Sequence, residues 1–260
     1  MSRKPIHFVI PAAGLGSRFK EAGFDVDKPF ISVNEIPMLI WAISNLAFEV
    51  SDLLTIVIRE DMAVPTEVNN FLSKLNPNYR FVKMSKLSGG SAETVEIALE
   101  DQPQDIPLIV VNSDQFLLSE LTGFIDLVRV GDSDGQILTM NATGNKWSYV
   151  NRNEDGFISE VREKIEISNE ATVGIYGWSN TKDYLYSLGA MKNAGDLVNG
   201  EFYVAPTYNY LISEGKKIEA LNIGNVSDKF FGLGTPEDLR LFLNQEFIQE
   251  KTFNIRSRLS

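Results

Sequence analysis

The sequence contains no cysteine and only one histidine, His7. A chain without cysteine has no disulfide framework, no thiolate metal site and no cysteine nucleophile. A Ser-His-Asp triad would need His7 as its general base. His7 stands at the start of the first apolar run, where a structural role is expected. Catalysis that depends on a thiol or an imidazole is therefore disfavoured.

Long hydrophobic runs and an excess of positive charge are also missing. No apolar stretch approaches the length of a membrane span, and the first residues, MSRKPIHF, lack the apolar core of a signal peptide. The net charge of −11 opposes binding to nucleic acid or to an anionic membrane. We expect a cytoplasmic protein with small-molecule partners. A polyanionic ligand would need cations that are concentrated locally.

The order of the apolar runs predicts one α/β domain over residues 1–260. Buried-type strands alternate with helices up to about residue 134, which predicts a parallel sheet with right-handed crossovers. From about residue 135 strands follow one another, which predicts a mixed or antiparallel extension. Strands are predicted over 8–10, 31–33, 54–58, 81–82, 106–111, 136–140, 147–150, 158–161, 172–178 and 217–222; helices are predicted over 37–46, 65–75, 92–99, 118–130, 182–192, 203–213 and 235–250, and a polar tail over 251–260 is expected to fray.

The stretch from His7 to Phe30 carries the clearest functional pattern. After the first predicted strand, Pro11 has no N–H to donate and ends the ladder. A turn of small residues follows, so that backbone N–H groups can approach a phosphate without interference: Ala12, Ala13, Gly14, Gly16 and Ser17. No helix is expected to begin at once after this turn. The turn matches neither the dinucleotide fingerprint nor a Walker loop.

Two cations accompany the small-residue turn. Arg18 follows it directly and can hold phosphate oxygens through two N–H groups. Lys28 comes ten residues later, before Pro29, and adds a point charge. The combination predicts a nucleoside triphosphate site. A tight loop with two surface cations is the alternative interpretation.

Two further features fall at the carboxyl ends of predicted strands, where ligands bind in parallel sheets. Asp114 follows the strand over 106–111, and its carboxylate is suited to Mg²⁺ that bridges triphosphate oxygens. Gly89 and Gly90 form a turn before Ser91, which is expected to be the N-cap of the helix over 92–99. A surface aspartate and a purely structural glycine turn are the alternatives.

The pattern of a strand, A-A-G-L-G-S-R-F, K-P-F and an apolar helix resembles the signature of the nucleotidyltransferases that activate sugar phosphates and related phospho-alcohols. Their pattern reads roughly L-A-A-G-x-G-[ST]-R, with K-P following, and Pro11 replaces the usual leucine here. The resemblance covers nearly the whole chain. It implies a GT-A-like α/β fold: a mainly parallel, Rossmann-like mixed sheet flanked by helices, with a small antiparallel acceptor-binding extension. Residues 1–134 would bind the nucleotide and residues 135–260 the acceptor.

The resemblance also implies roles for single residues. Arg18 and Lys28 would be catalytic, and Asp114 would hold Mg²⁺ as the cofactor. The nucleotide would contact Ala12, Ala13, Gly14, Gly16, Ser17, Gly89, Gly90 and Ser91. Glu163 and Lys164 resemble an E-K-P motif in which Ile165 replaces proline, although a solvated surface pair would read the same way. The implied acceptor-binding residues are Glu163, Lys164, Gly174, Asn199 and Glu201.

One position departs from the pattern. Many members of that family carry [FW]-x-D-[VIT]-G-[TN] near the end of the chain, and its Asp is a second metal ligand. Here the stretch reads F-F-G-L-G-T, and Gly232 takes the place of the acid. Asp114 would then hold Mg²⁺ with water and phosphates alone, or Glu201 or Asp228 would substitute.

The implied activity is transfer of an NMP from an NTP to a phosphorylated small molecule, with release of pyrophosphate, for surface polysaccharide precursors such as those of a capsule. A GT-A glycosyltransferase that uses an NDP-sugar is one alternative, which the G-x-G-S-R and K-P elements oppose. A non-catalytic nucleotide-binding subunit is another, which Gly232 favours. The base and the acceptor stay open among a hexose 1-phosphate, a heptose phosphate and a phospho-amine such as phosphocholine. Homo-oligomer formation stays open as well.

Overall fold

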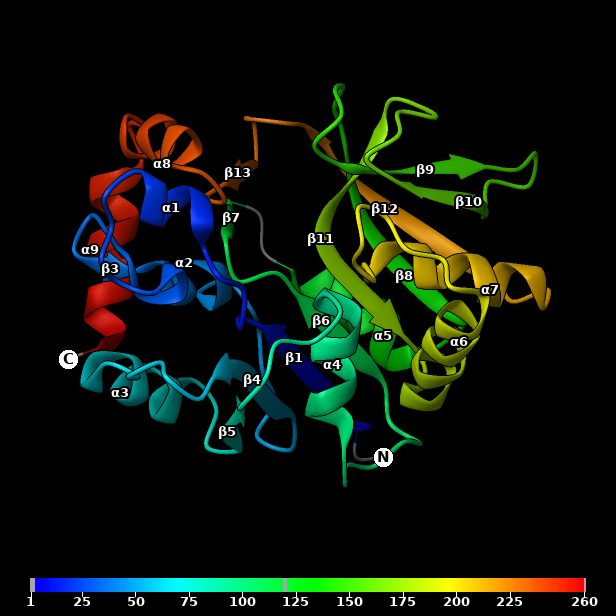
Figure 1. Cartoon of the computed structure of the whole chain (residues 1–260), viewed down its shortest axis with the longest axis horizontal. Coiled ribbons are helices and arrows are strands. Elements are labelled where there is room, and N and C mark those ends of the chain that lie inside the picture. The colour runs from blue at the N-terminus through cyan, green and yellow to red at the C-terminus, as the bar shows by residue number, and fades with distance from the viewer. Residues whose placement is uncertain (1–2, 119–120, 260) are drawn as a thin grey trace.

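A computed structural model describes residues 3–118 and 121–259, and a nine-stranded sheet forms the centre of this part of the chain (Figure 1). The strands run in the order β10-β9-β11-β6-β1-β4-β5, with β8 beside β11 and β12 beside β8. Their bounds are β1 (His7–Pro11), β4 (Leu53–Arg59), β5 (Tyr79–Met84), β6 (Leu108–Val111), β8 (Gly135–Asn141), β9 (Ser148–Arg152), β10 (Ile158–Glu163), β11 (Glu170–Trp178) and β12 (Ile218–Asn225).

The sheet is mixed in the way that the sequence predicts. β1 pairs in parallel with β4 and β6, and β4 pairs in parallel with β5. β11 runs antiparallel to β6 and β8, and β9 runs antiparallel to β10. The first half of the chain therefore builds the parallel part, and the strands after residue 134 build a mixed extension, which is antiparallel except that β12 pairs with β8 in parallel. The predicted fold class is confirmed.

Helices cover both faces of the sheet. Side chains alternate between the faces along each strand, so the buried strands present apolar side chains on both sides. In β1, Phe8 and Ile10 join one hydrophobic cluster and Val9 joins the other. The first cluster lies under α2 (Met38–Ile43), α3 (Thr66–Leu75), α5 (Thr122–Val130), α8 (Pro236–Leu243) and α9 (Ile248–Leu259), and the second lies under α4 (Ser91–Leu99), α6 (Thr181–Ala194) and α7 (Tyr208–Ser213). Within the described ranges, no helix combines the length and the apolar character needed to cross a bilayer.

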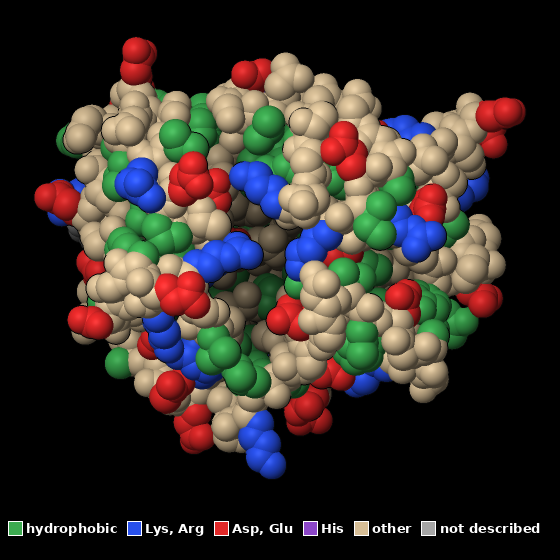
Figure 2. Space-filling view, turned by 45° about the horizontal axis from the view of Figure 1, so that its top comes forward, with side chains coloured by type: hydrophobic (Ala, Val, Ile, Leu, Met, Phe, Trp, Pro, Cys, Tyr) green, Lys and Arg blue, Asp and Glu red, His purple; other side chains and the backbone are tan. Residues whose placement is uncertain are grey.

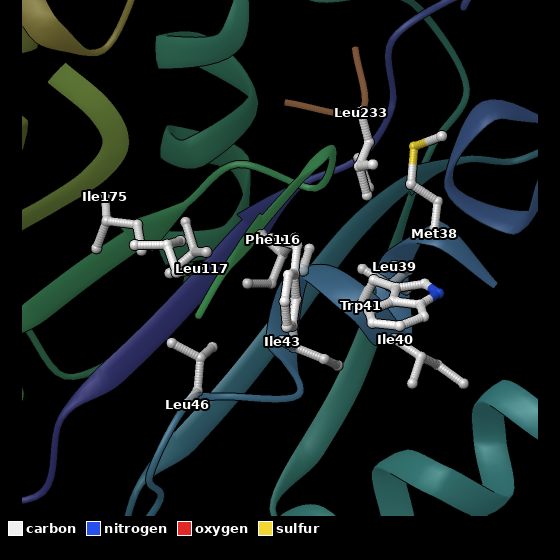
Figure 3. Close-up of a cluster of buried hydrophobic side chains, with 14 of the residues drawn as sticks. Met38, Leu39, Ile40, Trp41, Ile43, Leu46, Phe116, Leu117, Ile175 and Leu233 are labelled. Atoms are coloured by element: carbon white, nitrogen blue, oxygen red, sulfur yellow. The ribbon is translucent and has the colours of Figure 1, made fainter. Parts of the chain in front are cut away.

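A buried aromatic cluster fixes the end of the chain to its beginning. Trp41 of α2 packs edge-on against Phe116 and Phe242, at ring-centroid distances of 5.0 and 5.1 Å. Figure 3 shows Trp41 and Phe116 among the apolar side chains of α2, together with Leu233 from the segment before α8. Each such aromatic pair contributes about 0.5–1.5 kcal/mol beyond the area that it buries.

Two small sheets lie beside the main one. β2 (Ser32–Val33) pairs with β3 (Ile36–Pro37), and β7 (Gln115–Leu117) pairs with β13 (Phe230–Gly232). The sequence did not predict β7, and the helix expected over 118–130 begins at Thr122, with residues 119–120 outside the described part. The β7–β13 pairing matters for function because it brings the segment after residue 230 next to Asp114.

Three other expectations about helices were wrong. A short helix, α1 (Ser17–Glu21), follows the small-residue turn at once. The helix expected over 203–213 begins only at Tyr208, after a 3₁₀ turn over Ala205–Thr207. The helix expected over 235–250 ends at Leu243 as α8. A separate helix, α9, then forms over the segment where a frayed tail was expected. α9 packs against α3 with Thr252 and Ile255 buried, so tertiary contact stabilises this polar segment (Figure 1).

His7 is fully buried in β1, where Nε2 shares a hydrogen bond with Thr55 Oγ1 at 2.8 Å. Burial, assisted by the charge of Arg80, lowers the pKa of His7 from 6.5 to about 4. The folded protein thus binds this proton less tightly than the unfolded chain. His7 therefore costs no stability above about pH 6.5, and it lowers the free energy of unfolding progressively as the pH drops from 6.5 towards 4.

We expect the free energy of unfolding to lose up to about 3 kcal/mol through His7 across this window. Urea unfolding at pH 7, 5.5 and 4.5 measures the loss, and His7→Gln is the control because glutamine does not titrate. The acids titrate equally in both proteins, so the difference between the two pH profiles isolates His7. Parallel profiles for wild type and variant would contradict the prediction.

Candidate functional site

A cavity of about 470 Å³ opens at the carboxyl ends of β1 and β6. It lies between the turn after β1, the segment after β6, strands β9 to β11 and the segments around residues 201–205 and 230–238. Figure 2 shows a hollow in the middle of one face, with Lys and Arg side chains on its rim. Of the predicted site residues, the following line the cavity: Ala12, Gly14, Arg18, Lys28, Ser91, Asp114, Glu163, Gly174 and Glu201.

Lys28 and Asp114 meet inside the cavity. Lys28 Nζ donates to Asp114 Oδ2 at 2.5 Å, and the two side chains are 21% and 28% exposed. Lys28 begins a 3₁₀ turn over Lys28–Phe30, and Asp114 stands between β6 and β7. A Cβ built at Gly16 would lie 3.0 Å from Lys28 Cβ, so the glycine lets the turn pack against the lysine. A cation and an acid separated by 86 residues are thus held at one point.

Arg18 lies in the first turn of α1 and is exposed where it lines the cavity. Within the part of the chain that the structure describes, its guanidinium makes no ion pair. Arg18 therefore carries a charge that the fold does not use. The structure brings Arg18, Lys28 and Asp114 together around one cavity, and the two cations among them are of the kind that binds phosphate oxygens.

Some residues that were predicted to contact the nucleotide are not among the described residues that line the cavity: Ala13, Gly16, Ser17, Gly89 and Gly90. Ala13 is buried in the second cluster, and Ser17 is the first residue of α1. Gly89 O accepts from Phe202 N at 2.8 Å, and a Cβ at Gly90 would meet Phe202 O at 2.4 Å. The N-cap of α4 is Gly90 rather than Ser91, and the helix begins at Ser91, one position earlier than expected. The glycine turn therefore fastens the 202 segment to the start of α4.

Glu163 is a buried carboxylate on the acceptor side. The residue is only 8% exposed, lines the cavity and accepts a hydrogen bond from Ser148 Oγ. Burial raises the pKa of the Glu163 carboxyl, and the nearby Glu201 carboxylate raises it further, while Ser148 and the charge of Lys164 act in the opposite direction. A solvated surface pair does not describe this residue. A buried acid open to a cavity is suited to hydroxyl or amine donors of a ligand.

Lys164 and Asn199 lie outside the cavity lining among the described residues. Lys164 Nζ donates to the hydroxyl of Tyr203 at 2.5 Å and lies 4.3 Å from the centre of that ring. Asn199 and Gly200 form the tip of a turn that is closed by backbone bonds between Val198 and Glu201. This turn presents Glu201 to the cavity. The predicted binding roles of Lys164 and Asn199 remain predictions.

Gly174 stands where β11 departs from regular pairing, since its register with β8 shifts between Thr172 and Tyr176. Its φ is +76°, and a Cβ would lie 2.3 Å from Asn112 Nδ2. Gly174 O accepts from the backbone N of Asn112 at 2.9 Å. The glycine thus lets β11 touch the segment that carries Asp114.

We expect Gly174→Ala to lower the free energy of unfolding by about 2–4 kcal/mol, because a side chain meets both an unfavourable φ and an overlap with Asn112. Gly156→Ala is the matched control: its φ is +86°, but no atom lies within 4 Å of the added Cβ. Urea unfolding of both variants separates the overlap from the backbone cost. Equal losses in the two variants would show that Asn112 gives way.

Several cavity residues were not predicted from the sequence. Lys146 and Trp147 enter from the turn before β9, Ser148 from the start of β9, Tyr203 from the segment before α7, and Asp238 from the first turn of α8. Trp147 packs edge-on against Phe230, which also lines the cavity, at 5.5 Å. For Lys146 and Trp147, the sequence offered one signal, a lysine and a tryptophan at the start of a predicted strand.

The acids of the cavity suit a hard, oxygen-binding cation only in part. Among the described residues, no group of three or more His, Cys, Asp or Glu is placed to hold a metal ion. Mg²⁺ keeps several waters and commonly binds one or two carboxylates together with substrate phosphates. Asp114 therefore fits Mg²⁺ that enters with a triphosphate. Glu201 lines the cavity, but Asp228, the other substitute for an acid at Gly232, is bound to Asn225 and is exposed.

Sequence comparison gave no matches: no protein-family model and no curated protein matches the chain. Solved structures do match it. The nucleoside-diphosphate-sugar pyrophosphorylase from Vibrio cholerae RC9 superposes with a TM-score of 0.76 at 23% identity, covering 92% of this chain and 100% of its own. A putative glucose-1-phosphate thymidylyltransferase from Bacillus anthracis gives 0.71 at 17% identity, covering 93% and 97%.

The inositol-1-phosphate CTP transferase from T. maritima gives a TM-score of 0.69 at 14% identity and covers 100% of this chain and 98% of its own. These identities are low, but the superpositions extend over nearly the whole of each chain. The chain therefore has the GT-A-like fold of these sugar-phosphate and inositol-phosphate nucleotidyltransferases.

Proposed function

We propose that the chain is a nucleotidyltransferase that joins the NMP of a nucleoside triphosphate to a phosphorylated small molecule and releases pyrophosphate. The observation that carries the proposal is the convergence of Arg18, Lys28 and Asp114 on one cavity at the ends of β1 and β6. The solved structures with this fold bear the names of enzymes that act on a glucose or an inositol phosphate, or on nucleotide sugars, which supports the same substrate class.

The reaction needs no covalent enzyme intermediate. A phosphate oxygen of the acceptor attacks the α-phosphorus, the bond from that phosphorus to the bridging oxygen of the β-phosphate breaks, and pyrophosphate leaves with the electron pair. Catalysis then consists of positioning and of neutralising charge. Arg18 holds the β- and γ-phosphates and stabilises the departing pyrophosphate. Lys28 reaches towards the α-phosphate from its place beside Asp114.

The remaining predicted residues divide between the two substrates. Backbone groups of the turn after β1 and of the start of α4 face the nucleotide, and Glu163, Lys164, Gly174, Asn199 and Glu201 serve the acceptor. Asp114 is the residue that would hold Mg²⁺, together with water and phosphate oxygens. Held there, Mg²⁺ would supply positive charge that offsets part of the charge of the triphosphate.

We propose one domain with a nucleotide-binding part over 1–134 and an acceptor-binding part from residue 135. The C-terminal helices qualify this division, since α8 and α9 join the first hydrophobic cluster and α9 packs on α3. We further propose a cytoplasmic enzyme that supplies an activated precursor for a surface polysaccharide such as a capsule. The nucleoside-diphosphate sugar in the name of one structure of this fold supports that role.

The test is a matrix of ATP, CTP, GTP, UTP and dTTP against hexose 1-phosphates, a heptose phosphate, inositol 1-phosphate and phosphocholine, with pyrophosphate as the readout. We expect release in one row that depends on one acceptor. A glycosyltransferase would instead release a nucleoside diphosphate from an NDP-sugar. A nucleotide-binding subunit would bind an NTP without turnover. Absence of acceptor-dependent pyrophosphate over the whole matrix would overturn the proposal.

A further inference from the structure

Lys146 is a cation of the cavity to which the predicted chemistry gives no role. It lies in the turn between β8 and β9, and its side chain is 59% exposed. Among the described residues that line the cavity, the Lys and Arg side chains are Arg18, Lys28 and Lys146. Lys146 is thus the cation that the segment after residue 134 contributes to the cavity surface.

The contacts of Lys146 hold it loosely. Its Nζ lies 4.6 Å from the centre of the Trp147 ring and 3.4 Å from Asp238 Oδ1. Asp238 has Thr235 as a second partner. Its Oδ2 accepts a hydrogen bond from Thr235 Oγ1 at 2.8 Å, and its backbone N donates to Thr235 Oγ1 at 3.1 Å. These bonds cap α8 without Lys146. A long, exposed ion pair of this kind is weak, so the ammonium can exchange Asp238 for another anion.

Lys28 and Lys164, the other lysines that could bind the acceptor phosphate, already have close partners. Lys28 is paired with Asp114 at 2.5 Å. Lys164 donates to the Tyr203 hydroxyl, acts electrostatically on Glu163 and lies outside the cavity lining in the described chain. A phosphate that enters the acceptor side therefore finds Lys146 as the accessible ammonium.

No side chain projects from position 232 beside the Lys146–Asp238 pair. Gly232 lines the cavity there, and a Cβ built on it would lie 3.9 Å from Asp238 Oδ2. A carboxylate at position 232 would stand beside this pair and repel an incoming phosphate. With glycine in its place, the charge next to Asp238 is the ammonium of Lys146. The absent acid and the loosely held lysine are consistent with one anion site.

We propose that Lys146 binds the phosphate of the second substrate, exchanging its contact with Asp238 for charge-assisted hydrogen bonds to the phosphate oxygens. The inference rests on the proposed function for the identity of that phosphate. The anion site itself depends only on the position and the partners of Lys146. Asp238 is the anion that the phosphate displaces, so it competes with the phosphate for the ammonium of Lys146.

The test measures binding of inorganic phosphate by calorimetry, with inorganic tripolyphosphate present to fill the Arg18 side. We expect Lys146→Gln to weaken phosphate binding by about tenfold, because a charge-assisted hydrogen bond is lost. Its affinity for tripolyphosphate should stay within about twofold of wild type, since Arg18 and Lys28 are untouched. Lys217→Gln is the matched control, because Lys217 Nζ lies over the Phe157 ring at 5.6 Å and outside this cavity.

Wild-type phosphate affinity in Lys146→Gln would overturn the inference, and so would a wild-type protein that binds no phosphate. A loss confined to Lys164→Gln would assign the phosphate to Lys164 instead. Asp238→Asn should bind phosphate at least as tightly as wild type, and weaker binding would contradict the exchange. If the substrate matrix shows no turnover while Lys146→Gln loses phosphate, the proposed function fails and the anion site stands.

Discussion

Replacing Arg18 with alanine is expected to lower acceptor-dependent pyrophosphate release by about 100- to 1000-fold, the usual cost of removing one preorganised donor from developing charge. Arg18 lines the cavity, and its charge has no ion-pair partner within the described chain. Its removal should therefore leave the folded state intact. Thermal unfolding of the variant should match wild type, and steady-state pyrophosphate assays measure the loss.

Lys20→Ala provides the control for Arg18→Ala. Lys20 lies in the same short helix and is exposed, but it is not among the described residues that line the cavity. We expect Lys20→Ala to keep wild-type turnover, and Arg18→Lys to recover only part of it, because lysine cannot form two parallel hydrogen bonds to phosphate oxygens. Near-normal turnover in Arg18→Ala would remove the triphosphate assignment.

The parts of the site that sequence alone could predict are those tied to the ends of parallel strands. Arg18 and Asp114 follow β1 and β6, which the structure pairs side by side. Neighbouring parallel strands bring their carboxyl ends to one edge, so residues far apart in the chain become neighbours by a general rule. Lys28 needed the resemblance as well, because a 3₁₀ turn rather than a strand places it.

The acceptor side was harder to predict because its positions depend on pairings that the sequence does not signal. Lys146 is brought to the cavity by the turn before β9, and Asp238 by the β13–β7 pair and the start of α8. Local patterns identify such turns but not their distance from another strand. Glu163 was assigned to the acceptor side, but its burial could not be read from a Glu-Lys pair, which is usually solvated.

The end of the chain shows the same limit for the fold. α9 is polar, and although its buried side chains, Ile248, Thr252 and Ile255, stand at helical spacing, only the two isoleucines among them are apolar. Its hydrogen bonds reach distant residues, since Thr252 Oγ1 accepts from Asn34 and Arg258 donates to the carbonyl of Ser44. These long-range contacts stabilise the helix, whereas two buried isoleucines in a polar segment are too weak a local pattern to predict it.

Asp114→Asn is the second change with a large expected effect. The substitution keeps the shape of the side chain and removes the charge that pairs with Lys28. Because both side chains are part-exposed, we expect the free energy of unfolding to fall by less than about 1 kcal/mol. Pyrophosphate release should fall by about 100-fold or more, since Asp114 is the proposed ligand of the Mg²⁺ that would offset the charge of the triphosphate.

A metal-binding measurement shows whether this loss arises from the proposed ligand role. Mn²⁺ titrated with inorganic tripolyphosphate present and followed by electron paramagnetic resonance should bind Asp114→Asn about tenfold or more weakly than wild type, because a carboxylate ligand becomes an amide. Asp228→Asn is the control, since Asp228 is exposed and bound to Asn225. Unchanged Mn²⁺ affinity in Asp114→Asn, with a loss in Glu201→Gln, would move the metal to the acceptor side. Gly232 would then mark a relocated metal site, and Asp114 would act only by holding Lys28.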